Sequence, residues 1–159
     1  MNRVSLTQVR TAFLRIAIGL LLILAGIAKA MSPLGFYAAL NAAEWLPHTL
    51  SGLLVIGVPV VEVALGVGLL IGWKVRATAI LSFILMALFT GFLLIETARG
   101  NNINCGCFGE SNGLLALLTS GSGALIRNGL LLLMAASLIR SAASSDRWSI
   151  DGILCSYER

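Results

Sequence analysis

Four long apolar runs, separated by short polar segments, dominate the pattern of hydrophobic and polar positions along this 159-residue chain. A helix rises about 1.5 Å per residue and needs roughly 20 apolar residues to cross the hydrocarbon core of a bilayer. The pattern therefore predicts an all-α, single-domain membrane protein, with four spans joined by short connections as an antiparallel four-helix bundle. The predicted spans lie at about 12–30, 51–72, 77–98 and 124–140.

Two shorter features at the edges of these runs bear on the number of spans. The first run is longer than the apolar core of an ordinary signal peptide and three more runs follow it, so it is interpreted as an uncleaved span. A short apolar segment, 114–120, cannot cross a bilayer by itself. It either forms an interfacial helical turn or extends the fourth span across the "SGSG" at 120–123.

The composition supports a membrane location. Hydrophobic residues make up 58% of the chain, charged residues 11%, and the mean hydropathy is +0.95. Soluble domains have about 45–50% apolar and about 25% charged residues, so a chain of this size cannot hide its apolar surface from water, and the lipid bilayer is its expected partner. Nucleic acid is not expected as a partner, because no basic stripe interleaved with aromatic residues is present.

The basic residues predict how the chain is oriented. Eight of the 11 Lys and Arg residues fall on one side of the predicted spans and three on the other. By the positive-inside rule, both termini and the tail 141–159 are expected in the cytoplasm, and the connections 31–50 and 99–123 outside. The chain is thus predicted to be a multi-pass protein of the cell inner (cytoplasmic) membrane. The eight residues are Arg3, Arg10, Arg15, Lys74, Arg76, Arg140, Arg147 and Arg159, and the three are Lys29, Arg99 and Arg127.

Glu62 lies near the middle of the second span, where lipid disfavours a charge. A carboxylate at this depth costs about 2.5–3.5 kcal/mol on insertion scales, so it should face the protein interior or be protonated. Pro59, three residues earlier, frees a backbone carbonyl one turn back. Together they predict a polar pocket between the helices. The alternative is a single acid tied to a hydroxyl or backbone group for packing specificity.

Other polar residues lie near the ends of the spans. Lys29 and Arg127 are expected to snorkel to the headgroups, although Arg127, which Asn128 follows, is also placed where a thiolate would need a positive charge. Glu96 is interpreted as a solvated boundary charge, and His48 as a surface residue of the first outer connection. Small residues have two explanations: they mark faces where helices pack closely, or glycine is simply common in membrane helices. They are Gly19 and Gly26 on the first span, Gly57, Gly66 and Gly68 on the second, and Thr78 and Ser82 on the third.

Two cysteines, Cys105 and Cys107, stand one residue apart in the polar "NINCGCFGE" of the second outer connection. A metal site would need about four ligands, and only His48 and carboxylates remain on this side, so no metal is expected. A bridge between residues i and i+2 closes a small, strained ring and is a poor structural staple. Strained disulfides are the labile ones, and Gly106 allows the backbone bend, so redox exchange is favoured over these two alternatives.

The orientation also separates the cysteines. The pair lies on the oxidising side of the membrane, where disulfides persist, and Cys155 lies on the reducing side. Cys155 is therefore interpreted as a free thiol that cannot meet the pair.

The chain resembles the MauE branch of the DoxX-like membrane proteins. The resemblance covers about 12–140 and rests on "CGCFG", which includes Phe108, together with "AGIAK" at the end of the first span, "VPVVEVALGVGLL" in the second and "RN" at the start of the fourth. It implies a role in methylamine metabolism, in forming disulfides in a periplasmic methylamine dehydrogenase subunit. It also implies a thioredoxin-like partner, and quinone-dependent chemistry in some relatives.

The resulting hypothesis is a membrane thiol–disulfide oxidoreductase or disulfide-formation factor. Cys105 and Cys107 would exchange electrons with a dithiol of a periplasmic or exported protein, either thioredoxin-like or disulfide-rich, in either direction. A quinone near Glu62, Pro59 and Asn128 is the candidate cofactor. Lys29 and Arg127 would stabilise negative charge, and Glu62 would relay a proton.

Two other functional classes fit the sequence. In the first, the chain is a small-molecule carrier or channel subunit that uses Glu62, Lys29 and Pro59, and the cysteines are incidental. In the second, it is an assembly factor that holds a partner without turnover.

Overall fold

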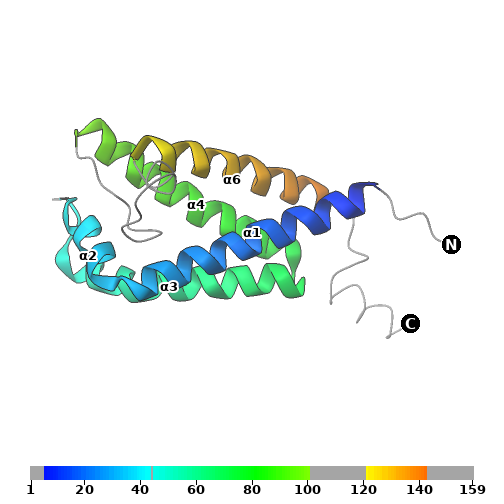
Figure 1. The fold of residues 1–159 in the computed structure, drawn as a ribbon, viewed down its shortest axis with the longest axis horizontal. Helices are drawn as coiled ribbons and strands as arrows, with labels where there is room; N and C mark the ends of the chain where they lie inside the picture. Colours follow the sequence, from blue (N-terminus) through cyan, green and yellow to red (C-terminus); the bar gives the residue numbers. More distant parts are fainter. Residues whose placement is uncertain (1–5, 44, 101–120, 143–159) are drawn as a thin grey trace.

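The computed structural model describes residues 6–43, 45–100 and 121–142, and the regular elements among them are all α-helices. This confirms the all-α prediction for these ranges. Figure 1 shows how the helices are arranged. They are α1 (Leu6–Met31), α2 (Pro33–Asn41), α3 (His48–Ile71), α4 (Val75–Ala98) and α6 (Gly121–Ala142).

Three of these helices are long and apolar enough to cross a membrane, as expected of a membrane protein. They are Val9–Met31 within α1, and the whole of α3 and α4. Each contains most of one predicted span, and its ends lie within a few residues of the predicted ends. The fourth predicted span, 124–140, lies inside α6, and its crossing of the membrane stays a prediction.

The long helices pack as two pairs. α1 lies along α3, and α4 lies along α6 (Figure 1). Contacts of α1 with α6 and of α3 with α4 join the pairs. At one end Arg10 of α1 donates a hydrogen bond to the Ser141 hydroxyl of α6, with an N···O distance of 3.0 Å. Ile18 and Leu69, both fully buried, belong to the apolar core between the four helices.

Glycines allow α1 and α3 to approach closely. A Cβ atom added to Gly19 would lie 2.9 Å from the carbonyl oxygen of Gly66, and one added to Gly66 would lie 2.7 Å from that of Gly19. Gly26 of α1 is equally close to α3. The predicted packing role is confirmed at these three positions, whereas a Cβ at Gly57 would meet open space.

The connection 31–50 contains a helix, α2, that the hydrophobic pattern did not predict. Its nine residues are too few to span a membrane. Pro33 lies in its first turn, where proline is common, because the backbone N–H that proline lacks has no partner within the helix at that position. Phe36 and Leu40 are buried, and α2 packs on α3. The chain therefore covers this end of the protein with a short helix.

Several predicted features lie outside the described residues. Cys105, Gly106, Cys107 and Phe108 fall within 101–120, and Cys155 falls within 143–159. The predicted pairing of the cysteines and the predicted loop and tail therefore stay predictions.

Candidate functional site

A buried ion pair joins the last turn of α1 to the middle of α3. The Lys29 ammonium nitrogen lies 2.6 and 2.7 Å from the two carboxylate oxygens of Glu62. The side chains are 2% and 6% exposed. The prediction that Glu62 faces the interior is confirmed, but its partner is a cation and not a hydroxyl or backbone group. The prediction that Lys29 snorkels is wrong, because its ammonium group turns inward to this carboxylate.

Close packing of the α1 and α3 backbones explains how the Lys29 and Glu62 side chains can meet. Gly26 lies one turn before Lys29, and a Cβ added there would lie 2.9 Å from the Pro59 carbonyl oxygen and 3.2 Å from the Glu62 Cβ. Without a side chain at Gly26, the two helices approach at the level of the ion pair. Charges removed from water need good geometry to recover their lost hydration, and two short contacts from one ammonium group to both oxygens provide it.

Two aromatic rings lie close to the ammonium group of Lys29. The nitrogen lies 4.9 Å from the ring centre of Phe89 on α4 and 5.8 Å from that of Phe36 on α2. The two rings stack with centres 6.0 Å apart and an interplanar angle of 23°. Both distances are in the range in which a ring face attracts a cation. Side chains from α2, α3 and α4 thus all contact the ammonium group that α1 contributes.

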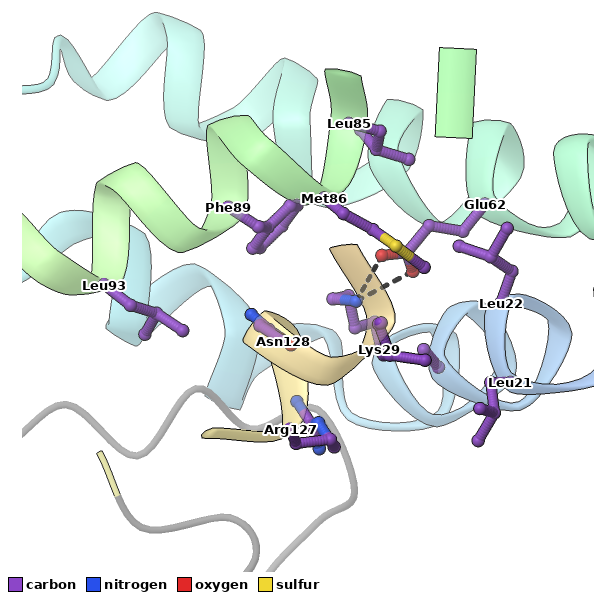
Figure 2. Close-up of a pocket in the computed structure, with 12 residues that line it drawn as sticks. Leu21, Leu22, Lys29, Glu62, Leu85, Met86, Phe89, Leu93, Arg127 and Asn128 are labelled. Carbon is purple, nitrogen blue, oxygen red and sulfur yellow. Dashed lines mark hydrogen bonds and ion pairs between the residues drawn. The ribbon is translucent and has the colours of Figure 1, made fainter. Parts of the chain in front are cut away.

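A small cavity of about 60 Å³ adjoins the ion pair, and we call it the polar cavity. Figure 2 shows Arg127 and Asn128, from the first turns of α6, on the same cavity as Lys29 and Glu62. Asn128 is 9% exposed, so its amide is almost wholly inside the protein. The remaining lining is apolar and comprises Leu21, Leu22, Ala25, Leu85, Met86, Phe89, Leu93 and Leu131.

The size and lining of the polar cavity limit what it can hold. A water molecule occupies about 30 Å³ in the liquid, whereas an apolar cavity that binds a benzene ring has about 150 Å³. The polar cavity therefore has room for about two waters or for a small polar group, and not for a whole six-membered ring. Its charged and amide groups suit proton-bearing or hydrogen-bonding groups.

A larger cavity of about 270 Å³ lies between α2, α3 and α4, and we call it the aromatic pocket. It shares Leu85 and Phe89 with the polar cavity. No charged side chain belongs to the lining among the described residues. The full lining is Phe36, Leu40, Trp45, Leu46, Leu54, Val58, Leu85, Leu88, Phe89 and Phe92.

Glu96 is a buried acidic residue near the C-terminal end of α4. It is 1% exposed, and its carboxylate accepts a hydrogen bond from the Trp45 indole nitrogen at 2.9 Å. The interpretation of Glu96 as a solvated boundary charge is therefore wrong. Trp45, in the α2–α3 connection, is one of its partners near the end of α4. His48 is exposed, as predicted, although it is the first residue of α3 and not part of a loop, and its Nδ1 lies 3.1 Å from the Asn41 side-chain oxygen.

The structure brings together four of the residues singled out from the sequence. Lys29, Glu62, Arg127 and Asn128 line one cavity. Pro59 lies beside it, with its carbonyl oxygen against Gly26.

Sequence reasoning missed the aromatic side of the site. Phe36 and Phe89 looked like ordinary apolar residues, one of them in a segment that was not expected to be helical. The only signal for them was that Phe36 lies within two helical turns of Lys29 along the chain.

The site lies towards the segment that carries the cysteine pair. Leu93 is seven residues before Gly100, and Arg127 is six residues after Gly121, where the description of the chain stops and resumes. At 1.5 Å per helical residue, both are about 10 Å along their helices from these points. The charged cavity thus belongs to the end of the protein at which 101–120 leaves and re-enters the helices.

Comparisons with known proteins show which family the chain belongs to. A family model described as "Methylamine utilisation protein MauE" matches residues 7–141. A curated protein of Paracoccus denitrificans named "Methylamine utilization protein MauE" is 34% identical over 102 residues, which is 64% of this chain and 54% of that protein. The match thus spans about half the length of this relative. No solved structure matches the chain significantly.

Proposed function

Since the chain belongs to the methylamine utilisation protein MauE family, we propose that it exchanges disulfides with a periplasmic or exported protein in methylamine utilisation. In this proposal the four long helices cross the inner membrane as an antiparallel four-helix bundle with both termini in the cytoplasm. Cys105 and Cys107 then face the oxidising side. The observation that carries the proposal is the buried, charged cavity at the end of the protein where the segment with both cysteines joins α4 and α6.

The exchange reaction balances through one mixed disulfide. A thiolate of the partner attacks one sulfur of the Cys105–Cys107 disulfide, and the other cysteine leaves as a thiolate. The partner's second thiol then attacks the mixed disulfide and closes the partner's own disulfide. Two electrons and two protons have moved from the partner to the cysteine pair. The reverse sequence would reduce the partner.

Charged residues of the polar cavity support this chemistry electrostatically. A cation near a cysteine favours the thiolate, which is both the attacking and the leaving form. Arg127 and Lys29 supply positive charge at this end of the protein, and Glu62 fixes the position of the Lys29 ammonium group. We propose Glu62 as the group that passes protons on, with Asn128 as its hydrogen-bonding neighbour across the cavity.

A quinone is the proposed electron acceptor. When bound, it would take two electrons and two protons from the reduced pair. Glu62, Asn128 and the carbonyl exposed by Pro59 are its proposed polar contacts, and the small volume of the polar cavity restricts them to the edge of a ring.

The test uses whole cells that express the full chain. A membrane-impermeant alkylating reagent should label Cys105 and Cys107 only after reduction, while Cys155 stays unlabelled until the cells are lysed. In Cys105→Ser or Cys107→Ser protein, a mixed disulfide with a periplasmic partner should accumulate, and the matched Cys155→Ser variant should show none. Free, unreactive thiols at 105 and 107, with partner oxidation unchanged in both variants, would overturn the proposal.

The buried ion pair favours one other function. A carrier or channel for a small molecule would use Lys29, Glu62 and Pro59 along its path, and it would not need the cysteines. Transport that survives the loss of both cysteines but not Glu62→Gln would select this alternative. If both changes abolish partner oxidation, the exchange reaction is retained.

A further inference from the structure

The aromatic pocket gathers a large share of the aromatic residues of the chain. Phe36, Trp45, Phe89 and Phe92 are four of the 11 aromatic residues, and all four line it. They form two ring pairs, Phe36 with Phe89 at 6.0 Å and Trp45 with Phe92 at 6.1 Å between centres. A lining made only to seat a lipid chain needs no such concentration of flat side chains.

The chemistry of the lining defines what fits. No charged side chain of the described residues lines the pocket, and the indole N–H of Trp45 already donates to Glu96. A charged ligand would therefore lose its hydration without compensation. Flat rings, in contrast, gain from stacked and edge-to-face contacts with aromatic side chains beyond the area they bury.

The volumes of the two cavities separate their possible contents. The aromatic pocket has about 270 Å³, against about 60 Å³ for the polar cavity. A cavity of about 150 Å³ suffices for one benzene ring, so a substituted six-membered ring fits the first and not the second. Phe89 lines both, so a ring in the aromatic pocket would lie next to the wall of the polar cavity.

We propose that the aromatic pocket between α2, α3 and α4 is a binding site for a flat, uncharged, membrane-soluble ring compound of the quinone class. The inference rests on the proposed function only for the choice of a quinone among such rings. The site itself requires no thiol chemistry, so binding can hold where disulfide exchange fails, and the reverse.

Trp45 provides a direct reporter of binding. The chain has three tryptophans, and Trp73→Phe with Trp148→Phe leaves Trp45 alone. The full-length protein in vesicles of saturated phosphatidylcholine is titrated with a decyl-substituted benzoquinone. We expect saturable quenching of Trp45 fluorescence. The control keeps Trp73 alone, which is 60% exposed at the α3–α4 turn and should show only linear, non-saturating quenching.

Two substitutions on α3 each add a ring, one inside the aromatic pocket and one outside it. Val58→Phe adds a ring to the buried side of the aromatic pocket and should weaken quinone binding at least tenfold. Ile56→Phe adds the same ring at a side chain that is 72% exposed, and it should change the binding constant by no more than about twofold, which is about 0.4 kcal/mol at RT of 0.59 kcal/mol. Should Val58→Phe fail to purify, Phe92→Leu removes one ring of the pocket and should weaken binding in the same direction.

A ring-free competitor separates a ring site from a lipid site. Decanol carries the same chain length without a ring and should not reverse the quenching. Non-saturating quenching of Trp45, equal displacement by decanol, or equal loss of binding with Ile56→Phe and with Val58→Phe would each overturn the proposal. Repeating the titration in Cys105→Ser/Cys107→Ser protein should give the same binding constant, which makes the result independent of the exchange reaction.

Discussion

The polar cavity and the aromatic pocket share the Phe89 wall, yet they differ in almost every physical property. The polar cavity is small and lined by two basic side chains, a carboxylate and an amide. The aromatic pocket is more than four times as large and has no charged lining among the described residues. The comparison suggests a division of work, with charge and protons handled on one side of Phe89 and a flat apolar molecule held on the other.

The helices that form each cavity also differ. The polar cavity lies against the glycine-packed pair of α1 and α3, whose backbones are as close as side-chain-free positions permit. The aromatic pocket is lined by the short helix α2, the α2–α3 connection, the first half of α3 and the middle of α4. The charged groups thus lie between two closely packed long helices, whereas one side of the aromatic pocket is formed by a nine-residue helix.

Removing one charge of the ion pair should have the largest effect on stability. Lys29→Met leaves the Glu62 carboxylate inside the protein without its 2.6 Å partner. Loss of one member of a buried pair costs about 3–5 kcal/mol. The free energy of unfolding of the purified protein in detergent, from denaturant titration, measures this.

The matched control removes both charges. Lys29→Met with Glu62→Leu replaces the pair by apolar side chains of similar size, and such replacements are often neutral or stabilising. The double variant should therefore recover most of the stability lost in Lys29→Met. If the double variant is less stable than Lys29→Met, the unpaired Glu62 carboxylate is not the cause of the stability lost in the single variant.

A methyl group at the glycine contact should have the next largest effect. In Gly26→Ala the new Cβ would lie 2.8 Å from a Val63 methyl and 2.9 Å from the Pro59 carbonyl oxygen, so α1 and α3 must separate. Overpacking of this kind typically costs about 1–3 kcal/mol. The same unfolding measurement applies.

Gly57→Ala is the control, at a glycine whose added Cβ would have no close neighbour. Nothing lies within 4 Å of a Cβ at this position in the same α3 helix. Alanine is favoured over glycine inside helices by about 0.5–1 kcal/mol, so this variant should be slightly more stable than the unmodified protein. Equal destabilisation by both substitutions would contradict close packing at Gly26.

The long helices could be predicted from the sequence because hydrophobic run length is a direct measure of what can lie in lipid. Glu62 was also placed correctly, since a charge at that depth must face inward. Its partner could not be found from the pattern. Lys29 is near a helix end, where snorkelling is inexpensive, and only the approach allowed by Gly26 shows that turning inward is possible.

Features that depend on the structure of the segment between α1 and α3 were the hardest to predict. Glu96 looked solvated because it stands at the end of a span, whereas in the structure it is buried and accepts a hydrogen bond from Trp45 of the α2–α3 connection. α2 is short and begins with proline, so its apolar residues did not reach the length of a span. The cysteine pair stood out by its spacing in a polar segment, and it lies outside the described residues. The family resemblance gave no indication of the aromatic pocket.

Substitution of the shared wall should have the smallest effect on stability and the sharpest meaning for the comparison. Phe89→Leu keeps an apolar side chain but removes the ring whose centre lies 4.9 Å from the Lys29 ammonium nitrogen. The loss should be about 0.5–2 kcal/mol, the range for a cation over an aromatic face. Phe13→Leu, at a side chain that is 68% exposed on α1, should change stability by less.

A double-mutant cycle shows which cavity this ring serves. If the ring stabilises mainly the charge, the effect of Phe89→Leu should largely disappear in Lys29→Met protein, because residues in contact give non-additive changes. If the effect is unchanged without the lysine, the ring contributes only apolar packing to the aromatic pocket. In that case Phe89 separates the two cavities without coupling them, and a ligand in the aromatic pocket would not alter the ion pair through this side chain.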